Sequence, residues 1–149
     1  MTDLYVALES LTARNYWDGE TYGDWETEYH YQGCNVYLAE EARGRIGVWT
    51  ERVEVDFEPE VGQVVFPIVV QYGTGNSFGH SSGETTLVAV VDTLEKALAV
   101  RDAIYNDNEA NRGGFGQIEV AGISFYNGTW KGYFENLESV HIETEMVRI

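Results

Sequence analysis

A glycine- and hydroxyl-rich segment, residues 73–83, holds the residue types best suited to binding a small ligand. It reads Gly-Thr-Gly-Asn-Ser-Phe-Gly-His-Ser-Ser-Gly, carries no acidic or basic side chain, and lies between two apolar runs. Glycine lets the backbone approach a ligand closely, and successive N–H groups with nearby hydroxyls bind anions without a fixed positive charge. A long biased loop of this kind is usually functional or disordered. The candidate ligand-binding residues here are Thr74, Ser77, Phe78, Ser81 and Ser82, with Phe78 expected to stack on a base.

The same segment contains a Gly-x-Ser-x-Gly pattern, residues 75–79, which in serine hydrolases exposes the nucleophile on a strand-to-helix turn. The element expected to follow is a strand, so that turn geometry is missing. Asp92 and His141 follow Ser77 in the order that an acid and a base would need, but no pattern brings them close to it. The glycine spacing also departs from the dinucleotide-binding fingerprint, which requires a helix at this point. We therefore predict a non-enzymatic protein without catalytic residues.

Potential metal ligands are sparse in this chain. His30, His80 and His141 are far apart in sequence. His30 and Cys34 are four residues apart, but a zinc site needs three or four ligands at characteristic spacings. The sequence predicts no metal site and no cofactor. Because Cys34 is the only cysteine, no internal disulfide can form, as is usual in a reducing cytosol.

A second group of ligand candidates surrounds a second glycine-rich segment, residues 113–116. If both segments lie at one end of the sheet, the cations near the second segment face an anionic ligand at the first. If they do not, these cations are ordinary solvated surface residues, which is the commoner role of Lys and Arg. The members of this group are Arg112, Trp130, Lys131 and Tyr133.

The chain is strongly acidic, with 25 Asp and Glu residues against 9 Lys and Arg residues and a formal charge of −16. The first sixty residues hold 14 of these acids and 4 of these bases. A body of this charge repels phosphate backbones, so direct binding to DNA or RNA is excluded as a function class. Two interpretations remain, a solubilising surface and a nucleic-acid mimic that occupies a basic groove of another protein. The solubility interpretation is favoured because acidic solvated faces are common.

The elements that must position these residues are mostly strands, because the apolar residues recur with period two. Pro67 cannot donate to a sheet ladder and predicts an edge position or a bulge. A change of phase at Gly122 predicts a second bulge, and Asn127-Gly128 favours a type I′ turn that leads into a strand carrying Trp130. The strands expected most clearly cover residues 4–8, 49–57, 64–72, 85–91, 117–126 and 139–147.

One helix is expected after residue 91. Asp92 is suited to cap it, with Glu95 three residues later as in a capping box, and it should end near residues 106–108. The predicted fold class is α+β: a mainly antiparallel sheet of about six strands, with one principal helix packed on a face. At 149 residues the chain is expected to form a single domain, residues 1–149.

The segment 15–32 mixes six Tyr and Trp residues with five acids and two glycines. Aromatic residues with a polar tip suit binding interfaces. The alternative is that these rings complete the core, and we favour that alternative. The role of the segment stays open at this stage.

Three sequence features together resemble small bacteriophage accessory proteins of unassigned function. They are a Thr-Gly-x-Ser-Phe-Gly segment at residues 74–79, the helix after Asp92, and Trp-Lys-Gly-Tyr-Phe-Glu-Asn-Leu-Glu at residues 130–138. The resemblance covers roughly residues 64–147. It implies a protein made in the cytoplasm of an infected host. Small accessory proteins of this kind often act against host defence, by capturing a signalling nucleotide or by blocking a host protein.

Three functions follow as hypotheses. The first is an anti-defence binding protein that sequesters a small phosphorylated or nucleotide ligand in a pocket formed by residues 73–83, at the interface of a homo-oligomer. The second is an acidic inhibitor that binds a host protein, in the manner of a nucleic-acid mimic, and the third is a minor virion or assembly protein. No apolar run approaches the length of a membrane span, and no secretory signal is visible at the N-terminus, so the expected location is cytoplasmic.

Overall fold

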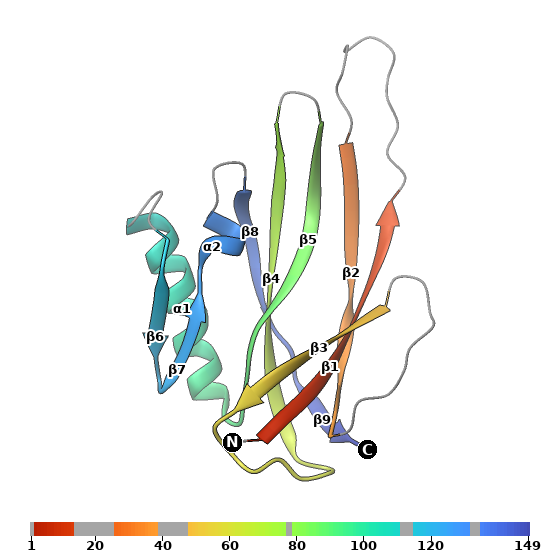
Figure 1. Ribbon diagram of the computed structural model, residues 1–149, viewed down its shortest axis with the longest axis vertical. Helices are drawn as coiled ribbons and strands as arrows, with labels where there is room; N and C mark the ends of the chain where they lie inside the picture. Colours follow the sequence, from red (N-terminus) through yellow and green to blue (C-terminus); the bar gives the residue numbers. More distant parts are fainter. Residues whose placement is uncertain (1, 14–25, 39–47, 77–78, 111–114, 132–134) are drawn as a thin grey trace.

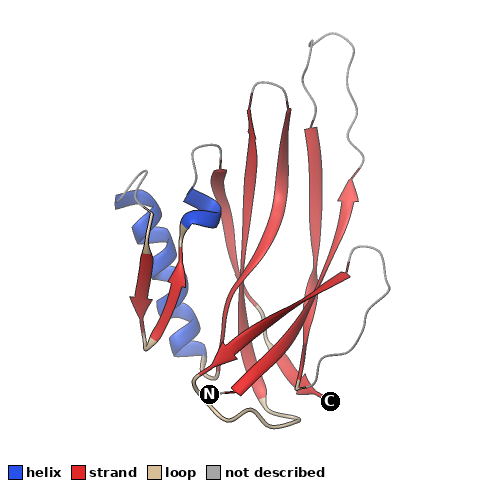
Figure 2. Ribbon diagram, in the orientation of Figure 1, coloured by secondary structure: helices blue, strands red, loops and turns tan. Residues whose placement is uncertain are grey.

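The computed structural model describes residues 2–13, 26–38, 48–76, 79–110, 115–131 and 135–149. A strongly curled mixed sheet makes up most of the described chain, and the main helix and a small hairpin lie to one side of it (Figures 1 and 2). Four predicted site residues, Ser77, Phe78, Arg112 and Tyr133, lie outside the described residues, as do residues 15–25 of the aromatic segment. The elements in chain order are β1 (Thr2–Ala13), β2 (Glu26–Tyr37), β3 (Val48–Val55), β4 (Val64–Asn76), β5 (Gly79–Val91), α1 (Leu94–Ala110), β6 (Gln117–Val120), β7 (Ile123–Tyr126), α2 (Gly128–Lys131), β8 (Glu135–Ile142) and β9 (Glu145–Arg148).

The first three strands form an antiparallel group in the order β3-β1-β2. Alternate residues of β1, namely Leu4, Val6 and Leu8, are fully buried, so the predicted strand over residues 4–8 is confirmed and is longer at both ends. In β3, Val55 is buried while Glu54 is exposed, as the period-two pattern predicts. This group therefore has one face in the core and one face in solvent.

The glycine-rich segment 73–83 is largely strand, which corrects the prediction of an eleven-residue loop. β4 continues to Asn76 and β5 begins at Gly79, and the two strands stay paired up to these residues. The register shifts between Tyr72 and Thr74, opposite Gly83, whose φ is 77°. A bulge at this point needs a residue that tolerates positive φ, and glycine supplies it. The glycines thus bend a long hairpin instead of opening a loop (Figure 1).

The sheet has seven strands, and most of its pairings are antiparallel, as predicted. It differs from the prediction of about six strands by one strand and by two short parallel pairings of β2. Its order is β3-β1-β2-β5-β4-β8, and β9 pairs with both β2 and β4. β2 runs parallel to β5 near its start and parallel to β9 near its end. Because β2 exchanges one neighbour for the other along its length, the sheet curls back on itself (Figure 1).

The expected single strand over residues 139–147 is two strands, β8 and β9. Between them, the Glu143 N–H donates to the carbonyl oxygen of Pro67 at 2.9 Å. Pro67 therefore lies where the partner of β4 changes from β9 to β8, and a register shift against β5 follows between Ile68 and Val69. The predicted irregularity near Pro67 is confirmed, although β4 is an inner strand rather than an edge.

The predicted helix is confirmed as α1, but its cap differs by one residue from the prediction. The Lys96 N–H donates to Thr93 Oγ1 at 3.2 Å, so Thr93 and not Asp92 provides the side-chain cap. Asp92 instead forms an ion pair with Lys96, with 3.0 Å between Asp92 Oδ1 and Lys96 Nζ. Ala97, Val100 and Ile104 recur at helical spacing and are fully buried, which fixes the face that packs on the sheet.

The region after α1 differs most from expectation. Residues 117–126 form a hairpin, β6 and β7, rather than one strand with a bulge, and Ala121 and Gly122 form its two-residue turn with φ of 52° and 78°. Positive φ at both positions is typical of a type I′ turn. The residues after Asn127 form the short helix α2 instead of the predicted turn and strand. Gly128 leaves room for the Tyr126 side chain, because a Cβ there would overlap the far end of its ring as it lies in this structure.

β4 and β5 separate two buried clusters, because alternate residues of each strand point to opposite sides of the sheet. On one side, Val65, Val69 and Val90 join the inner residues of β1 and β2. On the other side, Ile68 and Val70 pack with α1, Phe125 and Trp130. The central hairpin is thus covered on both sides, and the exposed features of the fold lie at its margins.

Candidate functional site

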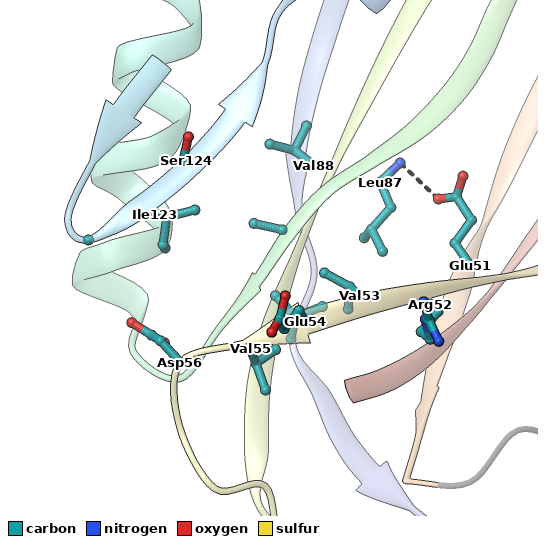
Figure 3. A pocket seen from close by; sticks show the side chains of 13 residues that line it. Glu51, Arg52, Val53, Glu54, Val55, Asp56, Leu87, Val88, Ile123 and Ser124 are labelled. Carbon is teal, nitrogen blue, oxygen red and sulfur yellow. Dashed lines mark hydrogen bonds between the residues drawn. The ribbon is translucent and has the colours of Figure 1, made fainter. Parts of the chain in front are cut away.

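A groove of about 750 Å³ lies between β3, β5 and the β6–β7 hairpin (Figure 3). It lies at the margin where β3 crosses β5. Apolar side chains from both strands and from Ile123 line much of it. The full set of lining residues is Glu51, Arg52, Val53, Glu54, Val55, Asp56, Leu87, Val88, Ala89, Val90, Gly122, Ile123 and Ser124.

Glu51 connects the two strands that border the groove. Its Oε2 accepts a hydrogen bond from the Leu87 N–H at 3.2 Å, drawn as the dashed line in Figure 3. Burial raises the pKa of the Glu51 carboxyl, and the hydrogen bond from Leu87 opposes that rise only in part. The Glu51 carboxylate therefore accepts a hydrogen bond from the Leu87 N–H, which donates to no strand among the described residues.

The remaining charge in the groove is mainly negative. Glu54 and Asp56 are exposed and form no ion pair among the described side chains. Arg52 is the only cation that lines the groove, and its Nε lies 3.7 Å from Asp3 Oδ2. Carboxylates over an apolar surface attract a cationic group and repel phosphate. The groove is thus suited to a basic partner.

The predicted ligand residues of the first group fall on the β4–β5 hairpin. Thr74 Oγ1 lies 3.5 Å from Glu135 Oε1, and the Gly83 N–H donates to Glu138 Oε1 at 2.7 Å. Ser81 and Ser82 are strand residues of β5, in register with Thr27 and Glu28 of β2. Carboxylates from β8 therefore already take up donors of this hairpin that a phosphate would need.

Two members of the second group, Trp130 and Lys131, are buried under the main helix. Lys131 Nζ donates to the carbonyl oxygen of Asp107 at 3.0 Å and to its Oδ2 at 3.1 Å. Asn127 Nδ2 donates to the same Oδ2 at 2.9 Å, and the Gly116 N–H donates to Asn127 Oδ1. Lys131 thus binds the last turn of α1, where a cation also interacts favourably with the helix dipole. These contacts join α1 to the hairpin and to α2.

Trp130 is 2% exposed and packs against Phe125, with their ring centroids 6.3 Å apart. Its Nε1 has no hydrogen-bond partner within the described part of the chain. The indole therefore contributes apolar packing to the second buried cluster.

A polar cluster of Gln71, Ser139 and His141 lies on neighbouring strands β4 and β8. His141 Nε2 contacts Gln71 Oε1, and Ser139 Oγ lies 3.1 Å from His141 Nε2 and 3.2 Å from Gln71 Oε1. The three side chains are therefore engaged with one another across the two strands. The cluster satisfies its own polar groups, and His141 and Asp92, noted in the sequence as a base and an acid, have different partners.

Tyr31 and Cys34 extend this cluster on β2. The Tyr31 ring lies 5.7 Å from the His141 ring, centroid to centroid. Burial raises the pKa of the Tyr31 hydroxyl and raises the pKa of the Cys34 thiol to about 12. A thiol with a pKa this high is almost wholly protonated near pH 7, so Cys34 is a buried structural residue rather than a nucleophile.

The part of the chain that the structure describes was compared with the requirements of a metal site and of a membrane-spanning helix. No three His, Cys, Asp or Glu side chains there are grouped to hold a metal ion. Among the same residues, neither helix has the length and apolar content needed to cross a membrane.

Sequence reasoning missed the groove because its residues are ordinary when considered one strand at a time. The alternation of Val53 and Val55 with Glu54 and Asp56 indicates only a half-buried strand with a wet face. The signal that was present is the acid density of the first sixty residues. Its meaning depends on β3 crossing β5, which no local pattern predicts.

Comparison with known proteins adds no relative: no family model matches the chain, and no curated protein or solved structure matches it. The resemblance to bacteriophage accessory proteins stays a prediction.

Proposed function

We propose that this protein is a non-catalytic binding protein whose acidic surface docks onto a basic surface of another protein. The observation that carries this proposal is the groove between β3 and β5, where Glu54 and Asp56 stand exposed beside apolar side chains. The formal charge of −16 supports the same function, because it accelerates encounter with a cationic partner.

The cations of the described chain add support, because acids already engage four of the five, Arg148 being the exception. Lys96, Arg101 and Lys131 each form an ion pair with an Asp at 3.0 to 3.3 Å, and Arg52 lies 3.7 Å from Asp3. A binding protein for phosphorylated ligands would need free donors or cations at its site. Sequestration of a nucleotide therefore has less support than docking onto a basic protein.

A photo-crosslinking experiment tests this proposal. A photoreactive amino acid is placed at Val88 in the groove, or at Leu98 on the exposed side of α1 as the matched control, in cells that produce the protein. We expect an adduct from position 88 alone, and we expect mass spectrometry to map it to a Lys- or Arg-rich segment of the partner. Adducts of equal yield from both positions, or none from position 88, contradict the proposal.

Native mass spectrometry of the purified protein tests the alternative function. A retained phosphorylated molecule would favour nucleotide sequestration over protein docking. A mass equal to that of the bare chain, together with the crosslink at position 88, supports docking onto a basic protein.

A further inference from the structure

The sheet is interrupted along one side of β5, at the floor of the groove. β5 pairs with β4 along nearly its whole length, but on the other side it pairs with β2 only through His80–Ser82. Among the described strands, none pairs with that side of β5 from Leu87 to Val90. The Leu87 N–H points there, since it donates to Glu51 of β3 instead of to a strand.

The unpaired stretch of β5 coincides with the groove. Leu87, Val88, Ala89 and Val90 all line it, and β3 borders it on one side and Gly122–Ser124 on another (Figure 3). Four residues of extended chain span about 13 Å. Gly122 and Ser124 are small, and nothing but Asp56 Oδ2, at 3.9 Å, approaches the position of a Cβ at Gly122. The groove therefore has the length and the space for a short extended segment.

The charges around this stretch determine which segment fits. Glu54 and Asp56 are two residues apart, so they lie on one face of the β3 end and alternate with Val53 and Val55. Arg52, on the same face, lies against Asp3, and Lys96, whose charge reaches Asp56, is paired with Asp92 at 3.0 Å. The uncompensated charge is thus negative and repeats at the two-residue period of a strand.

We infer that this groove takes up an extended segment of a partner protein, in which Lys or Arg alternates with apolar residues. The segment adds a strand beside Leu87–Val90 of β5, its basic side chains reach Glu54 and Asp56, and its apolar side chains cover the floor. This inference rests on the proposed docking function and assigns its surface and the chemistry of its partner. An acidic or purely polar segment would lack the charge match, and would leave apolar floor exposed.

Synthetic peptides test this inference on the full chain. The probe is an eight-residue peptide of alternating valine and lysine with a fluorescent label, and the comparison peptide has glutamate in place of lysine. We expect fluorescence anisotropy to show binding of the lysine peptide only, with weakening as salt is added. No binding of the lysine peptide at low salt overturns the inference.

Two charge-matched double variants locate the site. Glu54→Gln with Asp56→Asn is expected to weaken binding of the lysine peptide about tenfold, because both partner carboxylates are lost. Glu95→Gln with Asp102→Asn removes the same charge from the exposed surface of α1 and is expected to change affinity less than twofold. Equal weakening in both pairs overturns the groove assignment while leaving docking of the acidic surface intact.

Backbone pairing is tested separately with N-methylated peptides. Methyl groups on alternate amides remove the donors from one edge of an added strand. Methylation in one phase should abolish binding, and methylation in the other phase should preserve it. Equal affinity of both methylated peptides overturns strand addition. The crosslink at position 88 gives an independent readout, because it detects docking of a basic protein that does not add a strand.

Discussion

Asp107, in the last turn of α1, and Glu54, near the end of β3, are two acidic residues with opposite surroundings. Asp107 is bound by Lys131 and Asn127, and the Lys131 side chain is only 3% exposed. Glu54 is exposed beside the groove and has no ion-pair partner among the described side chains. Where the chain matches a carboxylate with a cation, the acid holds elements together. Where it leaves carboxylates unmatched over apolar surface, as at Glu54, the proposed function supplies the cation from a partner protein.

The same contrast holds for backbone groups. The Val140 N–H, on the outer side of β8, donates to no strand among the described residues but to Tyr105 Oη of α1 at 3.1 Å, so α1 covers that edge. On β5, the Leu87 N–H donates to Oε2 of Glu51 at 3.2 Å, and the groove rather than a helix lies along that edge. Covering exposed strand edges is a general protection against unwanted pairing. The edge of β8 is covered by α1, whereas the edge of β5 along Leu87–Val90 is open to the groove and is the edge proposed to bind a partner.

The largest effect is expected on the closed side, from Lys131→Met. This change leaves the Asp107 carboxylate without its cation and removes the donor to the last turn of α1. We expect the free energy of unfolding to fall by about 3 kcal/mol, which is typical of breaking a buried ion pair. Urea denaturation measures it. Lys96→Met, which breaks a more exposed pair, is the control and is expected to cost less than about 1 kcal/mol. Equal costs would remove the distinction between the two settings.

A smaller effect is expected at the start of α1, where two neighbouring acceptors have different roles. Thr93→Ala removes the side-chain cap and is expected to lower the free energy of unfolding by about 1 kcal/mol. Asp92→Ala removes only the pair with Lys96 and is expected to cost about 0.3 to 0.5 kcal/mol. Thermal and urea denaturation of both variants give the ranking. The reverse ranking would return the cap to Asp92, as the sequence predicted.

A stabilising change is expected at the hairpin that borders the groove. Ala121 has a φ of 52°, a conformation that costs an ordinary L-residue about 1 kcal/mol. Ala121→Asn places Asn-Gly in the turn and is expected to raise the free energy of unfolding by about 0.5 kcal/mol. Gly122→Ala is the control, because it adds the same strain at a φ of 78° and should destabilise the hairpin. A loss of stability in Ala121→Asn would show that alanine is retained for a contact rather than tolerated.

The strands and helix were predicted better from the sequence than the turns that connect them. The strand over residues 4–8, the half-buried β3 and the helix after residue 93 follow from apolar periodicity, which is a local property. The Asn127-Gly128 pair carries the strongest turn signal but begins a helix, while Ala121-Gly122 carries a weak signal and makes the turn. Ala121 and Gly122 both have positive φ, as a type I′ turn needs, whereas Gly128 is not among the glycines with positive φ.

The candidate site was less predictable than the fold. The side chains of Thr74, Trp130 and Lys131 were chosen for their types, yet the structure gives each of them a contact with another part of the chain. The groove arises from the parallel placement of β2 beside β5 and from β3 crossing β5. Both depend on contacts between residues far apart in sequence. The residues of one strand do not by themselves determine which other strand lies beside it.

The last prediction concerns Glu51, the acid that connects the two margins of the groove. Burial raises its pKa in the folded protein, so the folded state binds more protons than the unfolded state as pH rises past the ordinary carboxyl value. The contribution of Glu51 to the free energy of unfolding of the wild-type protein must therefore fall as pH rises through the raised pKa. Glu51→Gln keeps an acceptor for the Leu87 N–H without titrating, so it is expected to gain stability relative to wild type over that pH range. Urea denaturation from pH 4 to pH 8 gives the difference curve, in which the unchanged contribution of other titrating groups cancels.

Glu51→Met removes the acceptor as well and should be less stable than Glu51→Gln at every pH, because the Leu87 N–H is left unpaired. Parallel curves for wild type and Glu51→Gln would mean that this carboxyl is as well solvated as those of Glu54 and Asp56, and that the open edge of β5 has no special cover to displace.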